Sequence, residues 1–141
     1  MVSEKVIRKL LERLETSLKR LNSKKEISKE VFINNWEVHG AIIREFQIAI
    51  QSMIDIGTHL IAEMGWETPD YYKEVANILQ KHGVISKEYA EIFKKIIAFR
   101  NILVHEYLEL DLELVYDRLK NLEDIKRFAN FVEEFLERTS T

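Results

Sequence analysis

The chain has 141 residues, of which 46% are hydrophobic and 32% charged, so we expect one globular domain over residues 1–141 rather than a disordered chain. The absence of cysteine excludes disulfides and thiolate zinc sites. A net charge of −3 argues against sequence-blind binding of long nucleic acid, and charged residues break every long apolar run. We therefore expect a cytoplasmic protein that contacts no membrane.

Hydrophobic periodicity predicts helices throughout the chain. Four glycines, one proline and no sustained period-two alternation argue against strands. A first helix is predicted over residues 3–21, followed by a short turn that Ser28 caps. A long helix is predicted over residues 35–64, with Gly65 as its C-terminal stop.

Three further helical segments follow from capping signals. Thr68 before Pro69 predicts a helix start that leads to residue 81, and Ser86 predicts the cap of a helix that ends near residue 104. Asp111 predicts the cap of a last helix or helix pair. The fold class expected is all-α, an antiparallel bundle of about five helices.

Arg100 and His105 stand out in and just after the helix predicted from Ser86 to about residue 104. Residues 96–104 are apolar except for Arg100 and Asn101, and a guanidinium in such a run is costly to desolvate unless it meets an anion. Histidine has an unperturbed pKa near neutrality. The pair is typical of a fixed cation beside an acid or base, as metal-free phosphoryl chemistry requires. Lys94 and Arg44 could add to a small basic patch.

Helix geometry limits how these side chains can meet. Residues five apart, such as Arg100 and His105, point about 140° away from each other, whereas Asn101 and His105 are about 40° apart. Either the helix ends near His105 and the chain turns the imidazole back, or two copies share the site. The apolar surroundings favour a symmetric dimer, because so small a bundle would not cover this helix alone.

A structural role for these residues is the alternative, and spacing alone slightly favours it. Arg100 could pair with Glu45 or Glu63 of another helix. His105 could simply interact with a helix C-terminal dipole, and Tyr107 could be an interface or core aromatic.

Residues 100–107, RNILVHEY, resemble the Arg-x4-His-x-Tyr signature of the HEPN superfamily, and most closely that of its HepT-type toxins. The resemblance extends beyond this motif. Residues 47–63 are similar to the family's long second helix, and the segments from residue 83 into the motif and from Asp111 onward follow the family's order. The resemblance therefore covers nearly the whole chain.

The resemblance implies a metal-independent endoribonuclease, working as a homodimer on RNA without a cofactor. His105 would be the general base or acid, Arg100 would stabilise the phosphorane, and Asn101 would support them by orienting His105 or contacting phosphate. It also implies a nucleotidyltransferase antitoxin as partner. This partner would transfer AMP to Tyr107 and block the cleft.

Asp55, His59 and Glu63 form an i, i+4, i+8 ladder that could bind a metal, although a seam of hydrogen bonds is the stronger expectation. Asp55 or His59 could still support the cleft from behind the catalytic residues. The alternative function is a non-catalytic helical adaptor that binds a nucleotide or a nucleotidyltransferase. In that case Arg100 would hold a phosphate and His105 would only pack.

Overall fold

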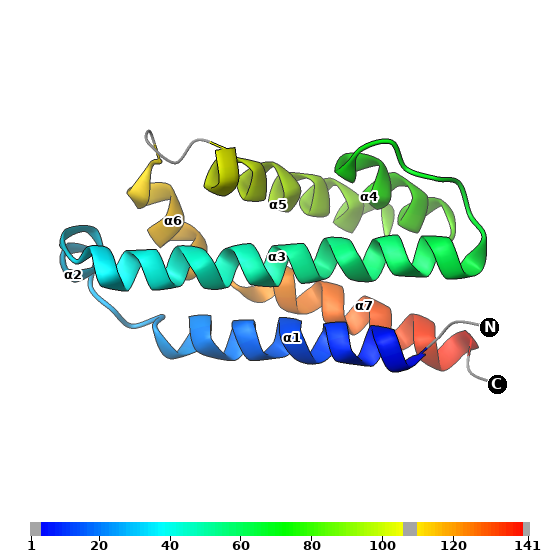
Figure 1. The fold of residues 1–141 in the computed structure, drawn as a ribbon, viewed down its shortest axis with the longest axis horizontal. Coiled ribbons are helices and arrows are strands. Elements are labelled where there is room, and N and C mark those ends of the chain that lie inside the picture. Colours follow the sequence, from blue (N-terminus) through cyan, green and yellow to red (C-terminus); the bar gives the residue numbers. More distant parts are fainter. Residues whose placement is uncertain (1–3, 106–109, 140–141) are drawn as a thin grey trace.

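The computed structural model describes residues 4–105 and 110–139, and every regular element in these ranges is a helix. Figure 1 shows the four longest helices running alternately in opposite directions along one long bundle. The all-α antiparallel fold is thus confirmed. Seven helices make up the described part of the chain: α1 Glu4–Ser23, α2 Lys29–Asn34, α3 Trp36–Met64, α4 Tyr72–Lys81, α5 Lys87–His105, α6 Leu112–Leu119 and α7 Glu123–Thr139.

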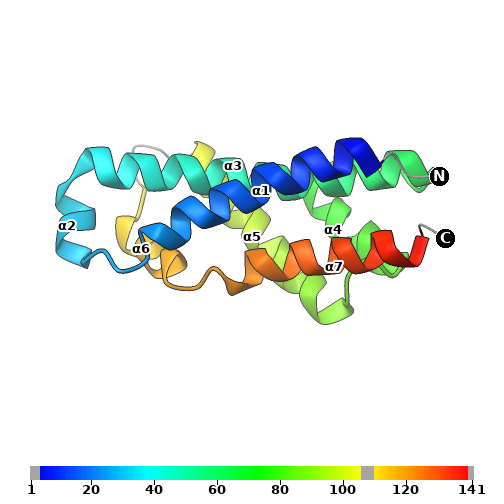
Figure 2. The ribbon, with the colours of Figure 1, turned by 90° about the horizontal axis from the view of Figure 1, so that it is seen from below.

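The seven helices correspond to the five expected ones with two refinements. The short turn expected after Ser28 is the six-residue α2, and the last segment is a pair, α6 and α7. Helix α3 runs the length of the bundle, with α1 and α7 on one side and α4 and α5 on the other (Figures 1 and 2). This central position lets α3 contact the helix that carries the motif.

Local side chains fix most helix ends where the sequence predicted them. Ser28 Oγ accepts a hydrogen bond from the backbone of α2 at 3.2 Å, and Ser86 Oγ accepts one from Tyr89 N at 3.1 Å. Asp111 caps α6 in the same way. Gly65 ends α3 with a φ of +69°, which glycine adopts without steric cost. These caps satisfy backbone groups that the helices leave unpaired.

The predicted start of α4 at Thr68 and Pro69 is wrong. The helix begins at Tyr72, and the Tyr71 side chain makes no capping hydrogen bond. Instead, Glu74 accepts a hydrogen bond from Asp70 N at 3.2 Å. The helix therefore starts three residues late, and its first turn places Tyr72 at the surface.

Tertiary contacts explain the late start. Glu67 accepts hydrogen bonds from Lys81 at 2.7 Å and from His82 at 2.8 Å, at the far end of α4. The Trp66 ring stacks on His82 with 4.1 Å between centroids. These contacts hold Trp66 and Glu67 against the C-terminal end of α4, and the residues between Glu67 and Tyr72 therefore stay outside the helix. The hydrogen bond from Lys81 is also the main reason that the pKa of Glu67 is lowered to about 2.

Helices α3 and α4 pack closely at Gly57. A Cβ at this position would lie 2.6 Å from Val75 Cγ1, closer than packed atoms allow, and a tight 3.1 Å from Leu79 Cδ1. The described helices share one hydrophobic core, in which Phe46, Tyr89 and other large side chains are fully buried. None of the described helices is long and apolar enough to cross a bilayer.

Candidate functional site

Arg100 lies half-buried on α5 and is held by neutral amide groups. Its Nη2 donates to Gln51 Oε1 on α3 at 3.0 Å, and its Nη1 donates to Asn101 Oδ1 at 3.2 Å. Among the residues that the structure describes, no carboxylate forms an ion pair with Arg100. Its guanidinium charge is therefore fixed in place but not neutralised, which suits it to meet an anion from outside.

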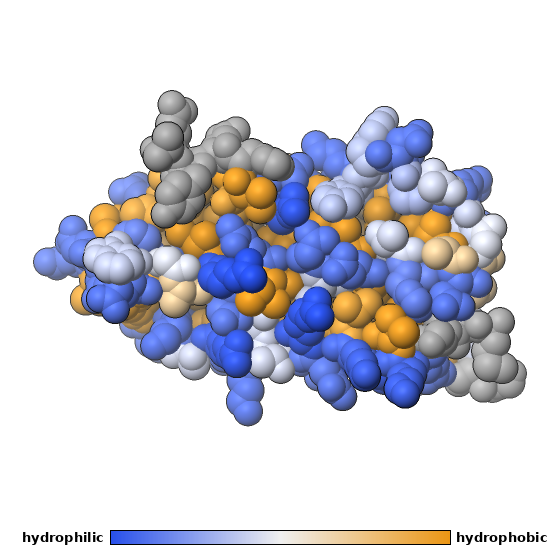
Figure 3. All heavy atoms as spheres, in the orientation of Figure 1, coloured by the Kyte–Doolittle hydropathy of each residue, from blue (hydrophilic) through white to orange (hydrophobic). Residues whose placement is uncertain are grey.

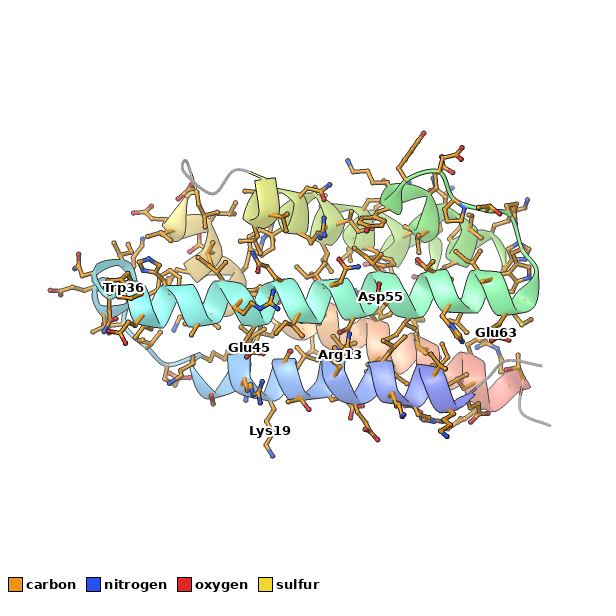
Figure 4. All side chains as sticks on the ribbon, in the orientation of Figure 1. Arg13, Lys19, Trp36, Glu45, Asp55 and Glu63 are labelled. Carbon is orange, nitrogen blue, oxygen red and sulfur yellow. The ribbon has the colours of Figure 1, made fainter. Side chains whose placement is uncertain are left out.

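The two acidic residues considered as partners of Arg100 lie elsewhere. Glu45 forms an ion pair with Arg20 of α1 at 3.3 Å, and Glu63 lies 3.3 Å from His59 Nε2. Figure 4 shows Glu45 and Glu63 well apart along α3. The expectation that Arg100 pairs with either of them is wrong, because α3 presents Gln51 to it instead.

Gln51 links Arg100 to Asp55. While its carbonyl oxygen accepts from Arg100, its amide Nε2 donates to Asp55 Oδ1 at 2.9 Å. A neutral side chain thus bridges a cation and an anion, and all three residues are half-buried. Asp55 therefore stands behind Arg100, one residue removed from it. His59 Nε2 lies 3.3 Å from a Glu63 carboxylate oxygen but forms no hydrogen bond with the described residues, and among these residues it makes no polar contact with Arg100 or Gln51.

The exposed side of Arg100 opens on a hollow of about 410 Å³ between α4 and α5. The guanidinium carbon lies 5.3 Å from the centre of the Tyr72 ring, a cation–π distance. Tyr71 and Lys73 line the hollow together with Asn101. Tyr71 and Tyr72 are 67% and 40% exposed, so aromatic faces and cationic groups meet solvent in the same place.

The remaining motif positions lie at the end of α5. His105 is the last residue of the helix, so its position is about 140° around the axis from Arg100 and about 40° from Asn101. The helix thus continues through residue 104 and ends where the sequence indicated. Tyr107, the expected AMP acceptor, lies outside the described residues.

The sequence model of a family described as ribonuclease HepT-like matches residues 7–135. The chain belongs to this family. A candidate RNase of Archaeoglobus fulgidus is 37% identical over 94 residues, which are 64% of this chain and 68% of that protein. The mRNA nuclease HepT of Shewanella oneidensis is 26% identical over 102 residues, which are 72% of this chain and 77% of that protein.

A solved structure shows the same fold over nearly the whole chain. The tri-AMPylated HEPN toxin of Shewanella oneidensis, in complex with an MNT antitoxin, superposes with a TM-score of 0.84 and 22% identity. The match covers 95% of this chain and 99% of that toxin. The HepT-like helical arrangement is thus common to both proteins.

In this HepT-like protein, the sequence indicated neither Gln51 nor Tyr72 as a neighbour of Arg100. Gln47 and Gln51 extend the ladder of Asp55, His59 and Glu63 backward by two turns at the same four-residue spacing, so a polar stripe along an apolar helix was a usable signal. No comparable signal existed for Tyr72, because its place beside Arg100 depends on where α4 begins. Among the described residues, no group of three or more acidic or histidine side chains is arranged to hold a metal.

Proposed function

We propose that this HepT-like protein is the toxin of a toxin–antitoxin pair, a metal-independent endoribonuclease whose catalytic residues are Arg100 and His105. One observation carries the proposal. The guanidinium of Arg100 is fixed by Gln51 and Asn101, has no carboxylate partner among the described residues, and opens on a hollow at the surface. A preorganised cation of this kind stabilises negative charge that develops at phosphorus.

The proposed reaction is attack of a ribose 2′-hydroxyl on the adjacent phosphorus. His105 accepts the hydroxyl proton as the new P–O2′ bond forms. The P–O5′ bond to the next nucleotide breaks with its electron pair on the 5′-oxygen, which takes a proton from solvent water. The products are a 2′,3′-cyclic phosphate and a 5′-hydroxyl. Arg100 stabilises the phosphorane, and Asn101 orients His105 or contacts the phosphate. Asp55 supports Arg100 through Gln51, and His59 has at most a supporting role. No step calls for a cofactor.

The site is proposed to be complete only in a homodimer of single domains. Within one chain the positions of Arg100 and His105 are about 140° apart on α5, so one substrate atom is better reached from two copies. Ala98 and Ile102 are half-exposed on α5, and Val104 is 39% exposed. Ala98 and Ile102 lie on the side of α5 that holds Asn101 and His105, and Val104 lies on the side of Arg100. Apolar side chains that remain partly exposed next to both motif positions support pairing with a second copy. We propose that the dimer acts in the cytoplasm.

Nuclease activity is tested with purified protein and RNA in excess EDTA. We expect wild-type cleavage, and a loss of at least about a hundredfold in kcat/KM in Arg100→Ala and His105→Ala. Arg138→Ala is the matched control, because Arg138 contacts the Gly83 carbonyl and the Phe135 ring and lies far along the chain from the motif. Helical circular dichroism must match wild type in all variants. Full cleavage by His105→Ala would refute the mechanism.

Tyr107 is proposed to be the acceptor of AMP from a cognate nucleotidyltransferase antitoxin. The HEPN toxin of Shewanella oneidensis is tri-AMPylated in its complex with an MNT antitoxin. Intact mass after incubation with ATP, magnesium and the neighbouring nucleotidyltransferase should rise by one or more AMP units in wild type but not in Tyr107→Phe. An equal gain in both proteins would move the modification to another residue. Nucleotidyltransferase binding without RNA cleavage would favour the non-catalytic adaptor.

A further inference from the structure

A second hollow lies between α1 and α3, next to the site of Arg100. Its volume is about 480 Å³, and its lining among residues 4–105 and 110–139 contains three arginines and no acidic residue. We call it the arginine groove, and the side chains used in the argument are Arg13, Thr16, Arg20, Arg44, Gln47 and Gln51. Figure 4 shows Arg13 between α1 and α3, and Figure 3 shows hydrophilic side chains gathered along the same seam.

The absence of acid from the groove lining contrasts with the composition of the chain, which has 24 acidic and 21 basic residues. Arg20 forms an ion pair with Glu45, and Arg44 donates to Gln47 at a long 3.5 Å. Within residues 4–105 and 110–139, Arg13 and Arg44 have no carboxylate partner. Two of the three guanidinium groups are therefore available to an external anion. Lys94 does not belong to this group, because it pairs with Glu91 at 3.0 Å.

The groove adjoins the candidate site through two glutamines. Gln51 lines the groove and also accepts the hydrogen bond from Arg100, at 3.0 Å. Gln47, one turn earlier, lines the groove and donates to the Leu103 carbonyl of α5 at 3.3 Å. A ligand that leaves the groove over Gln47 and Gln51 of α3 thus reaches Arg100 on α5.

The spacing of the cations indicates a long anion. Arg13 and Arg20 are seven residues apart on α1, which places them about 10 Å apart along the helix. Cations spread over this length, with Arg44 lining the same groove from α3, match successive phosphates of a nucleic acid strand. Neutral hydroxyl and amide groups, such as those of Thr16 and Gln47, are further common donors to backbone phosphates and sugars.

We infer that the arginine groove binds the phosphate backbone of single-stranded RNA on one side of the bond cleaved at Arg100. This inference rests on the proposed ribonuclease function and adds the path of the substrate. The contacts are to backbone, so the groove contributes affinity and register rather than sequence preference. The negative net charge of the chain is no obstacle, because the cations are concentrated where the strand lies.

Binding is tested apart from cleavage with a fluorescein-labelled 12-nucleotide 2′-O-methyl RNA, which lacks the attacking hydroxyl. Fluorescence anisotropy is measured from about 50 to 300 mM salt for wild type, Arg13→Gln, Arg44→Gln and the double variant. Each lost phosphate contact should make the negative slope of log K against log salt shallower by about 0.7, where K is the association constant. At 0.1 M salt this corresponds to an affinity about fivefold weaker than that of wild type. Lys19→Gln is the control. It changes the same charge on the same helix, but Lys19 points away from the bundle (Figure 4).

Unchanged slopes in both arginine variants, or an equal loss in Lys19→Gln, would overturn the inference. So would arginine variants that bind RNA normally but no longer bind the nucleotidyltransferase, since the groove would then be a protein interface. A wild-type protein that binds this RNA through the groove but cleaves no unmodified RNA would refute the nuclease and leave the groove assigned. If the wild-type protein cleaves unmodified RNA while the arginine variants bind the 2′-O-methyl RNA as tightly as wild type, the nuclease is supported and the groove is refuted.

Discussion

Replacing Gln51 with leucine removes the bridge between Arg100 and Asp55 at nearly constant volume. Two hydrogen bonds to charged groups are lost, at 3.0 and 2.9 Å. Such bonds contribute about 1.5–3 kcal/mol each when fully buried. Gln51, Arg100 and Asp55 are all half-buried, so hydrogen bonds to water replace part of the lost free energy. We therefore expect a net destabilisation of about 1–2 kcal/mol. For a chain of this size, that lowers Tm by about 2–8 °C.

The effect of Gln51→Leu on catalysis should exceed its effect on stability. Arg100 keeps its charge but loses the contact that fixes it to α3, and misplacement of a catalytic group by about 1 Å can cost about a hundredfold in rate. We expect kcat/KM for RNA cleavage to fall by about ten- to a hundredfold, mostly through kcat, at temperatures where the variant is folded.

Tyr116→Phe is the matched control for stability. The substitution removes one hydrogen bond, from the Tyr116 hydroxyl to the Ile27 carbonyl at 2.8 Å. The Tyr116 ring packs against Phe32 of α2, so its contacts lie at α2 and the preceding turn rather than at α5. Cleavage kinetics and thermal unfolding are measured on the same preparations. If Gln51→Leu loses no more activity than Tyr116→Phe, Gln51 does not position Arg100 and the reasoning is refuted.

Three further predictions concern packing, the aromatic neighbour of the site, and pH. Gly57→Ala should destabilise the protein by about 1–3 kcal/mol in urea unfolding, because its Cβ would overlap α4, whereas Gly40→Ala, which meets no atom within 4 Å, should stabilise by about 0.5–1 kcal/mol. Equal effects would contradict the packing argument. Tyr72→Ala should lower kcat/KM about two- to fivefold through the lost cation–π contact with Arg100, and Tyr72→Phe should retain wild-type activity. Because the pKa of Glu67 is about 2 when folded against an ordinary 4.5, its contribution to stability should be present above about pH 4.5 and lost as the pH falls toward 2. Glu67→Gln should flatten that part of the pH–stability curve, and an unchanged curve would exclude this contribution.

Local sequence determined the helices and most of their ends. Asn35, Ser86 and Asp111 carry oxygens that cap the following turn, and Gly65 adopts the left-handed conformation that ends α3. These effects act over a few residues, so they can be recognised without knowing the fold. The apolar run around Arg100 likewise marked the candidate site, since a charge in such a run is conspicuous in sequence.

Only the tertiary structure decided what surrounds Arg100. The choice of Gln51 over Glu45 or Glu63 depends on how α3 is rotated and shifted against α5, which no local pattern specifies. The late start of α4 depends on contacts between residues fifteen apart, and it sets Tyr72 beside the guanidinium. The arginine groove likewise joins α1 to α3 across more than twenty residues. Helix formation is a local property of a sequence, whereas the partners of a charged side chain follow from packing of the whole bundle.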